Sequence, residues 1–213
     1  MYIIDDTYFQ FPKREIPNLD EADSKSFVEL ERLIDEKCRL FMHNFLTPTE
    51  ITDFETHLVS GIFPVVTTGI PQKWIDLVNG KSYTINGVDL KWNGLIYTKG
   101  TYKGSLLADY VYHSWLETQV SYMTGVGDAK GQPKGAFLVN PTQRITNVWN
   151  EFVNHYQEIW TYNNGYNYFN YNLYLGYYIQ NKEVSLIQFL QDNQTIYTSE
   201  NRTFFQVKNQ LGI

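Results

Sequence analysis

One long apolar stripe in the last third of the sequence constrains the fold of this chain most. It begins after Asn140-Pro141, where an N-cap residue followed by proline is typical of the start of a helix. Apolar residues then recur at three- and four-residue steps, at Ile145, Val148, Trp149, Phe152, Val153, Tyr156, Ile159 and Trp160. This spacing predicts an amphipathic α-helix over 140–160 with a wide face that has to be buried.

A second long helix is expected to cover that face. It is predicted over 103–123, where a stripe is formed by Leu107, Tyr110, Val111, Ser114, Trp115, Thr118 and Tyr122. The two helices are expected to pack antiparallel around the connection 124–139. The core anchors of this central pair are then expected to be Trp115, Trp149, Phe152 and Tyr156.

Shorter elements surround the central pair. Further helices are predicted over 24–45, 48–59, 72–79 and 186–192. The helix at Pro48 is preceded by a capping box, Thr47 to Glu50, in which each side chain bonds the backbone amide of the other residue. Asn86-Gly87 lies between alternating β-formers and predicts one β-hairpin over 82–91, because both turn residues tolerate positive φ.

Both ends of the chain are expected to be extended. Residues 1–23 lack helical periodicity and contain two prolines, and residues 161–213 combine a Tyr/Asn-rich segment with an apolar tail. The expected fold is therefore mainly α: an antiparallel helical bundle with one β-hairpin and extended N- and C-terminal arms. One domain over 1–213 is expected, with its helical body at 24–160.

Composition and charge restrict the classes of partner. The net charge of −6 argues against a protein whose main task is to grip nucleic acid, which needs a clustered basic surface. Aromatic residues make up 16% of the chain, a share that suits surfaces that meet one another but also carbohydrate-binding faces. No stretch approaches the roughly 20 apolar residues of a membrane span, and the acidic N-terminus does not resemble a secretion signal.

The sequence carries no recognisable catalytic, metal-binding or cofactor-binding pattern. The four histidines, His43, His57, His113 and His155, lie on separate predicted helices without metal-ligand spacing, and Cys38 falls on a buried stripe. The glycines of 125–131 follow a helix rather than a strand, and the third comes one residue late for a dinucleotide loop. We therefore expect no enzyme, cofactor or metal, and we interpret this segment as an interhelical loop. Its lysines, Lys130 and Lys134, are candidates for contact with an adjacent subunit.

Several segments resemble a known family. They are Ala108-Asp109-Tyr110-Val111-Tyr112-His113-Ser114-Trp115-Leu116, Thr124-Gly125-Val126-Gly127, Val148-Trp149-Asn150-Glu151-Phe152-Val153, Ser185-Leu186-Ile187-Gln188-Phe189-Leu190 and Lys208-Asn209-Gln210-Leu211-Gly212-Ile213. Together they resemble the head–tail connector (ring or adaptor) proteins of tailed bacteriophages, especially the crAss-like phages of gut Bacteroidales.

The resemblance implies a structural virion protein. Such proteins form rings, commonly of twelve subunits, that lie beneath the portal and join capsid to tail around the DNA channel. The implied partners are further copies of the chain, the portal protein and adjacent neck or tail ring proteins. DNA would pass through without specific binding. The implied location is the neck of the virion, after synthesis in the host bacterial cytoplasm. Candidate intersubunit contacts are Tyr2, Tyr8, Phe9, Phe204, Phe205, Leu211 and Ile213.

Two other functions stay open at this point. The tyrosines within 162–178 could stack on sugars in a glycan- or receptor-binding module, although sugar-binding folds are mostly β. An enzyme, such as a phage-encoded hydrolase, would need acidic side chains gathered in a cleft, and the linear sequence does not indicate one.

Overall fold

The computed structural model describes residues 3–19, 21, 24–85, 87–120, 122–124, 127–129, 142–157, 161–163, 166–168 and 182–197. A short 3₁₀ helix, η1, covers Asp6–Phe9. The α-helices are α1 (Lys25–Met42), α2 (Pro48–Glu55), α3 (Gln72–Asn79), α4 (Leu106–Val120), α5 (Thr142–Tyr156) and α7 (Leu186–Asp192). The strands are β1 (Lys81–Ile85), β2 (Val88–Trp92), β3 (Ile96–Lys99), β4 (Tyr102–Ser105), β5 (Tyr122–Thr124), β6 (Gly127–Ala129), β7 (Thr161–Asn163), β8 (Tyr166–Tyr168) and β9 (Lys182–Glu183).

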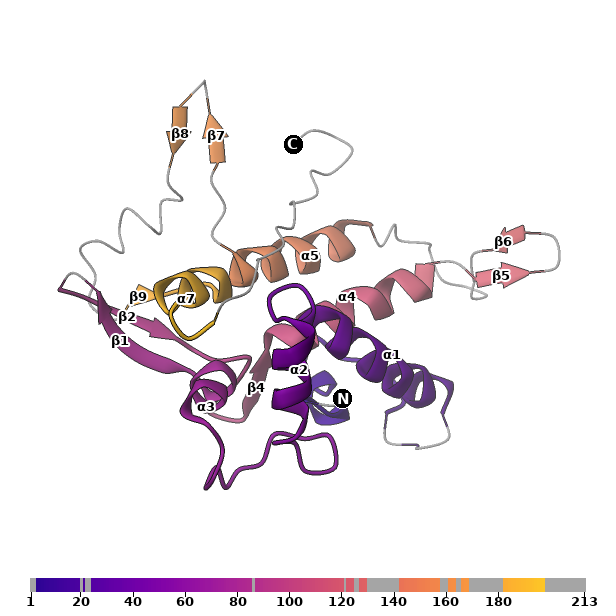
Figure 1. The fold of residues 1–213 in the computed structure, drawn as a ribbon. Coiled ribbons are helices and arrows are strands. Elements are labelled where there is room, and N and C mark those ends of the chain that lie inside the picture. Colours follow the sequence, from indigo (N-terminus) through magenta and orange to yellow (C-terminus); the bar gives the residue numbers. More distant parts are fainter. Residues whose placement is uncertain are drawn as a thin grey trace.

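Helix α4 lies between α1 and α5 (Figure 1). It runs antiparallel to α5: the His113 ring lies 4.7 Å from the Trp149 ring, while Asp109, one turn earlier, faces His155. Phe41 of α1 packs against aromatic rings of both other helices, at 5.5 Å from Tyr110 and 5.9 Å from Phe152. The aromatic stripes that the sequence places on these helices therefore meet in one core.

The helix starts follow from local chemistry. The capping box predicted at Thr47 is confirmed: its hydroxyl accepts from the Glu50 amide, and the Glu50 carboxylate accepts from the Thr47 amide. Ser24 and Ser185 cap α1 and α7 in the same manner, with side chains that accept from the amides of Phe27 and Gln188. Each cap satisfies a backbone N–H that has no partner inside its helix.

Strands form several small sheets. The predicted hairpin is confirmed: β1 pairs with β2 in the register Ile85↔Val88, and Gly87 has a φ of 79°. β9 adds to β2 in parallel, which makes a three-stranded sheet β1-β2-β9. β3 and β4 form a second hairpin, turned at Gly100 with φ 64°. Within it the Tyr97 ring lies directly over Gly104, where a Cβ would meet the ring at 2.2 Å.

The expected antiparallel helical bundle with one β-hairpin is wrong. The described residues hold a three-stranded mixed sheet and further two-stranded sheets beside the helices. Residues 103–105, predicted as the first turn of a helix, instead belong to β4 because they pair with β3. Helix α4 begins after them, where the Ser105 hydroxyl accepts from the Ala108 amide.

The expected extended arms are also wrong where the structure describes them. At the N-terminus, Ile3, Ile4, Phe9, Ile16 and Leu19 are buried in the core, because an apolar segment gains more from packing than from exposure. At the C-terminal side, Leu186, Phe189 and Leu190 of α7 are buried as well, and the Phe189 ring stacks on Trp92 at 5.6 Å. Residues 198–213 lie outside the described part.

Helix α3 ends in close contact with the chain that follows β2. The Leu77 carbonyl accepts from both the Trp92 indole N–H, at 3.0 Å, and the Leu95 amide, at 3.1 Å. Gly80 and Gly94 allow this approach: each has positive φ, and a Cβ on either would lie within 2.5 Å of a backbone oxygen. This contact fixes the sheet β1-β2-β9 against the helices.

Candidate functional site

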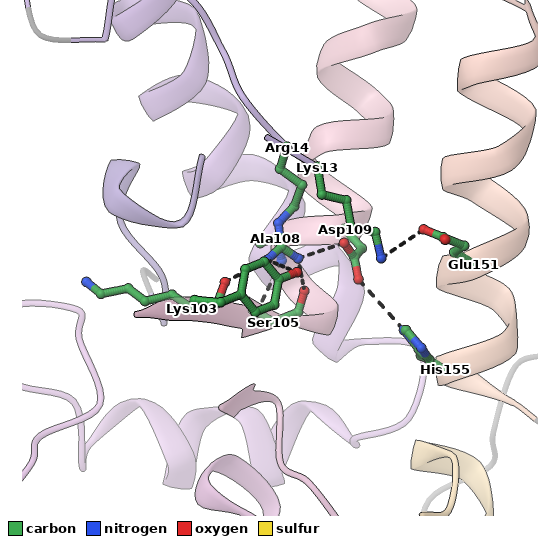
Figure 2. A network of polar contacts seen from close by, with 9 residues as sticks. Lys13, Arg14, Lys103, Ser105, Ala108, Asp109, Glu151 and His155 are labelled. Atoms are coloured by element: carbon green, nitrogen blue, oxygen red, sulfur yellow. Dashed lines mark hydrogen bonds and ion pairs between the residues drawn. The ribbon is translucent and has the colours of Figure 1, made fainter. Parts of the chain in front are cut away.

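A buried polar network joins the N-terminal segment to β4, α4 and α5 (Figure 2). Its centre is Arg14, whose guanidinium makes four hydrogen bonds. Nη1 donates to Asp109 Oδ1 at 2.7 Å and to the Ser105 carbonyl at 3.2 Å. Nη2 donates to the Lys103 carbonyl at 2.7 Å and to the Tyr102 hydroxyl at 2.8 Å. We call Arg14 and these four partners the Arg14 clasp.

The clasp requires the shape of arginine. Its planar guanidinium donates in several directions at once, so that it reaches two backbone carbonyls of β4, one carboxylate and one hydroxyl. The Tyr102 ring lies 5.3 Å from the guanidinium carbon and contacts Phe11 edge-on. A lysine ammonium could not satisfy the same set of acceptors.

A second layer of charge lies on the α5 side of the clasp. The ammonium of Lys13 lies 2.8 Å from Glu151, and His155 Nδ1 lies 3.9 Å from the second oxygen of Asp109. The Lys13–Glu151 pair is half exposed and contributes little to stability. The Arg14–Asp109 pair is buried, at 1% and 6% side-chain exposure, so breaking it has a large effect.

The groups around Asp109 lower its pKa. Burial alone would raise the pKa of this carboxyl, but its contact with His155 and the positive charges of Arg14 and Lys13 outweigh the burial. The net effect is a pKa below the ordinary value of 3.8. Asp109 is therefore ionised throughout the physiological pH range.

Together with His155, the clasp contains the residue types of a hydrolytic triad but not a usable arrangement. Ser105 is 1% exposed, and its hydroxyl caps α4 by accepting from the Ala108 amide. Asp109 Oδ1 is taken by Arg14 rather than by a histidine. A nucleophile has to reach its substrate, which a fully buried serine does not. The arrangement supports a structural role that holds the N-terminal segment in place.

The expected core anchors have clear positions in the structure. Phe152 and Tyr156 are fully buried, Trp115 is 7% exposed and Trp149 is partly buried against the core. Trp115 stacks on Tyr112 with ring centroids 5.9 Å apart, and the Tyr112 hydroxyl accepts from Arg144 of α5. These side chains hold the antiparallel pair α4 and α5 together.

The expected intersubunit contacts are only partly described. Phe9 is fully buried in the core of its own chain, so it has no surface left for a neighbouring subunit, and that expectation is corrected. Tyr8 is partly buried next to Lys103, and burial, followed by the charge of Asp5, raises its pKa to about 12. The other candidates lie outside the described residues: Tyr2, Phe204, Phe205, Leu211, Ile213, Lys130 and Lys134.

Other chemically active side chains stay separate. Within the described ranges, no group of three or more His, Cys, Asp or Glu side chains could hold a metal ion. Cys38 is fully buried beneath the N-terminal segment, where the Ile3 amide contacts its sulfur, and burial raises its pKa to about 12. None of the helices in the described part is long and apolar enough to cross a membrane.

An exposed apolar turn follows α2, and the sequence reasoning missed it. Val59 and Ile62 exchange backbone hydrogen bonds across Ser60-Gly61, both of which have positive φ. Together with Val65 and Val66, which are 100% and 74% exposed, they form what we call the apolar turn, residues 59–66. Residues 58–72 contain no ionisable side chain, and this gap in the charge pattern was the available signal.

The apolar turn is anchored to α2 by its own buried residue. Phe63, the buried member of the segment, stacks on Phe54 of α2 with ring centroids 6.0 Å apart. The paired backbone and the anchored phenylalanine fix the turn, so its aliphatic side chains do not fold back onto the core.

Comparison of the chain with protein-family models, with curated proteins and with solved structures gave no match.

Proposed function

We propose that this chain is a structural subunit of an oligomeric ring in the neck of a tailed bacteriophage, where it joins the portal and capsid to the tail around the DNA channel. The apolar turn is the observation that carries the proposal. Four exposed aliphatic side chains on a fixed turn suit a surface that another protein covers. The resemblance of 103–160 and of the C-terminal segment to connector proteins supplies the biological setting.

Charge and chemistry support a protein partner for the turn. Residues 58–72 contain no Lys or Arg that would pair with phosphate, so the turn does not suit nucleic acid. The exposed large hydrophobic residues of the described part are aliphatic, namely Val28, Leu40, Val59, Ile62, Val65, Val66 and Ile196. Sugar recognition usually uses exposed aromatic rings, so the described surface favours protein contact over glycan binding.

A structural role also agrees with the polar network. The buried serine and paired aspartate of the Arg14 clasp secure the fold and leave no accessible nucleophile. In a closed ring each subunit presents two different surfaces to its two neighbours, so an exposed patch such as the apolar turn is compatible with ring closure. The net charge of −6 suits a channel through which DNA moves without binding, because an acidic chain does not attract phosphate.

Mass spectrometry of purified phage particles tests the proposal. The chain should be present in particles at a fixed ratio to the portal protein, and it should remain after tail fibres are removed. Its absence from washed particles would rule out a neck subunit and favour a binding protein that acts elsewhere.

A further inference from the structure

We propose that residues 3–19 form a strap that opens and closes as one unit over α1 and α4, with the Arg14 clasp as its latch, and that opening uncovers Cys38. This conformational step is independent of the proposed function. The strap consists of the N-terminal segment with η1, which lies against α1, α4 and β4.

The strap is held to the body without a backbone ladder. The backbone–backbone hydrogen bonds that the structure describes for it join Tyr8 to Asp5, Arg14 to Phe11 and Ile16 to Phe9, all within the segment. Its polar links to α4, α5 and β4 come instead from the side chains of Arg14, Lys13 and Thr7. A segment attached in this manner can leave without breaking a helix or sheet of the body.

Internal bonding makes the strap a unit rather than a loose chain. Asp5 caps η1 because its side chain accepts a hydrogen bond from the Thr7 amide. At the end of η1, the Phe9 carbonyl accepts a hydrogen bond from the Ile16 amide. Its buried apolar side chains are spread from one end of the strap to the other, at Ile3, Ile4, Phe9, Ile16 and Leu19. Opening therefore withdraws all of these side chains from the core together.

The clasp makes opening all-or-none. Arg14 is inserted with 1% side-chain exposure, and its withdrawal leaves Asp109 as a buried carboxylate without its arginine. The other Asp109 oxygen faces His155 of α5, at 3.9 Å, which does not replace the hydrogen bond from the guanidinium. Partial opening therefore has a high energy, and the strap is either latched or released.

Opening has a specific chemical consequence at Cys38. The thiol is fully buried, and Ile3 at the start of the strap contacts its sulfur through the backbone amide. When the strap leaves, this cover leaves with it, and the thiol becomes accessible while α1 stays folded. An opened strap also exposes the apolar surface on which it rested.

Thiol labelling of the folded 213-residue chain tests the strap. With an aromatic disulfide reagent in low concentrations of urea, Cys38 of the unmodified protein should react through a local opening, with a weaker dependence on urea than global unfolding has. Arg14→Lys should raise the labelling rate by about tenfold or more, because lysine cannot satisfy the clasp. Arg32→Lys, which makes the same exchange at an exposed arginine outside the strap, is the matched control and should change the rate little.

The unmodified protein alone can overturn the proposal, so the test does not depend on a variant that folds. If Cys38 of the unmodified protein labels with the same urea dependence and the same free energy as global unfolding, the strap does not open separately. Equal labelling rates in the Arg14→Lys and Arg32→Lys variants would exclude the clasp as the latch.

Discussion

Arg14 Nη1 lies 2.7 Å from Asp109 Oδ1, although 95 positions separate the two residues in sequence. Both side chains are buried, and the guanidinium also donates to the carbonyls of Lys103 and Ser105 in β4. This single contact therefore sets the positions of the N-terminal segment, β4 and α4 relative to one another.

Variants of Arg14 and Asp109 should show how far the stability of the fold depends on the pairing of these two charges. Arg14→Met leaves Asp109 charged and buried, and it should lower the free energy of unfolding by about 3–5 kcal/mol in urea titrations. The double variant Arg14→Met with Asp109→Leu should be less destabilised than the single variant, because it leaves no buried charge. If the loss of unfolding free energy in the double variant equals the sum of the losses in Arg14→Met and Asp109→Leu alone, the two residues are not a coupled pair.

Acid should weaken the fold through Asp109. Its pKa is lowered in the folded chain, so its contribution is present above the ordinary value of 3.8. As the pH falls below that value the unfolded chain takes up the proton first, and the contribution is lost as the pH falls through the folded pKa. Asp109→Asn should flatten this part of the stability profile, measured by urea titrations from pH 5 down to about pH 2. If the unfolding free energy of Asp109→Asn falls with acid as steeply as that of the unmodified protein, Asp109 is not the responsible group.

His113 should act in a higher pH window. Burial between α4 and α5, only partly opposed by the charge of Glu117, lowers its pKa below 6.5. Its contribution to stability is therefore present above pH 6.5 and is lost as the pH falls toward the folded pKa. An NMR titration of the imidazole should give a midpoint below 6.5, and His113→Gln should remove this part of the pH dependence. A midpoint above 6.5 would contradict the burial argument.

Two glycines offer a matched comparison. Both Gly94 and Gly69 have positive φ, at 96° and 85°, so alanine is strained at either position by about 1–2 kcal/mol. A Cβ on Gly94 would also lie 2.4 Å from the Val78 carbonyl oxygen, whereas none of the described atoms lies within 4 Å of the same position on Gly69. Gly94→Ala should therefore destabilise clearly more than Gly69→Ala in thermal unfolding. Equal losses would mean that the chain after β2 moves freely away from α3.

The apolar turn should matter for assembly and not for folding. Because Val65 and Val66 are exposed, replacing both by Ser should change the free energy of unfolding of the isolated chain by less than about 0.5 kcal/mol per site. The same double variant should fail to enter particles in a complementation assay. Val28→Ser, at an exposed site on α1, is the control and should assemble normally. Normal incorporation of the double variant would remove the turn from the interface.

Local signals in the sequence predict local structure well. The Thr47–Glu50 capping box and the Asn86-Gly87 hairpin each depend on residues a few positions apart, and both are confirmed. The antiparallel packing of α4 on α5 followed from two aromatic stripes joined by a connection.

Long-range contacts account for what the sequence did not predict. The N-terminal segment looked like an arm because the partner that holds Arg14, Asp109, lies far along the chain. Residues 103–105 of β4 were predicted as helix because their strand conformation depends on pairing with β3 and not on a pattern of their own. The apolar turn was missed because exposure depends on which side chains the fold leaves uncovered, and within residues 59–66 Phe63 alone is buried.

Electron cryomicroscopy of the particle neck is the most direct test of the proposed ring. We predict a closed ring of this chain between the portal and the tail, with Val65 and Val66 covered by a neighbouring protein. A ring in which the apolar turn faces solvent would contradict the role given to the turn. A neck map with no density for this chain would contradict the proposed function itself.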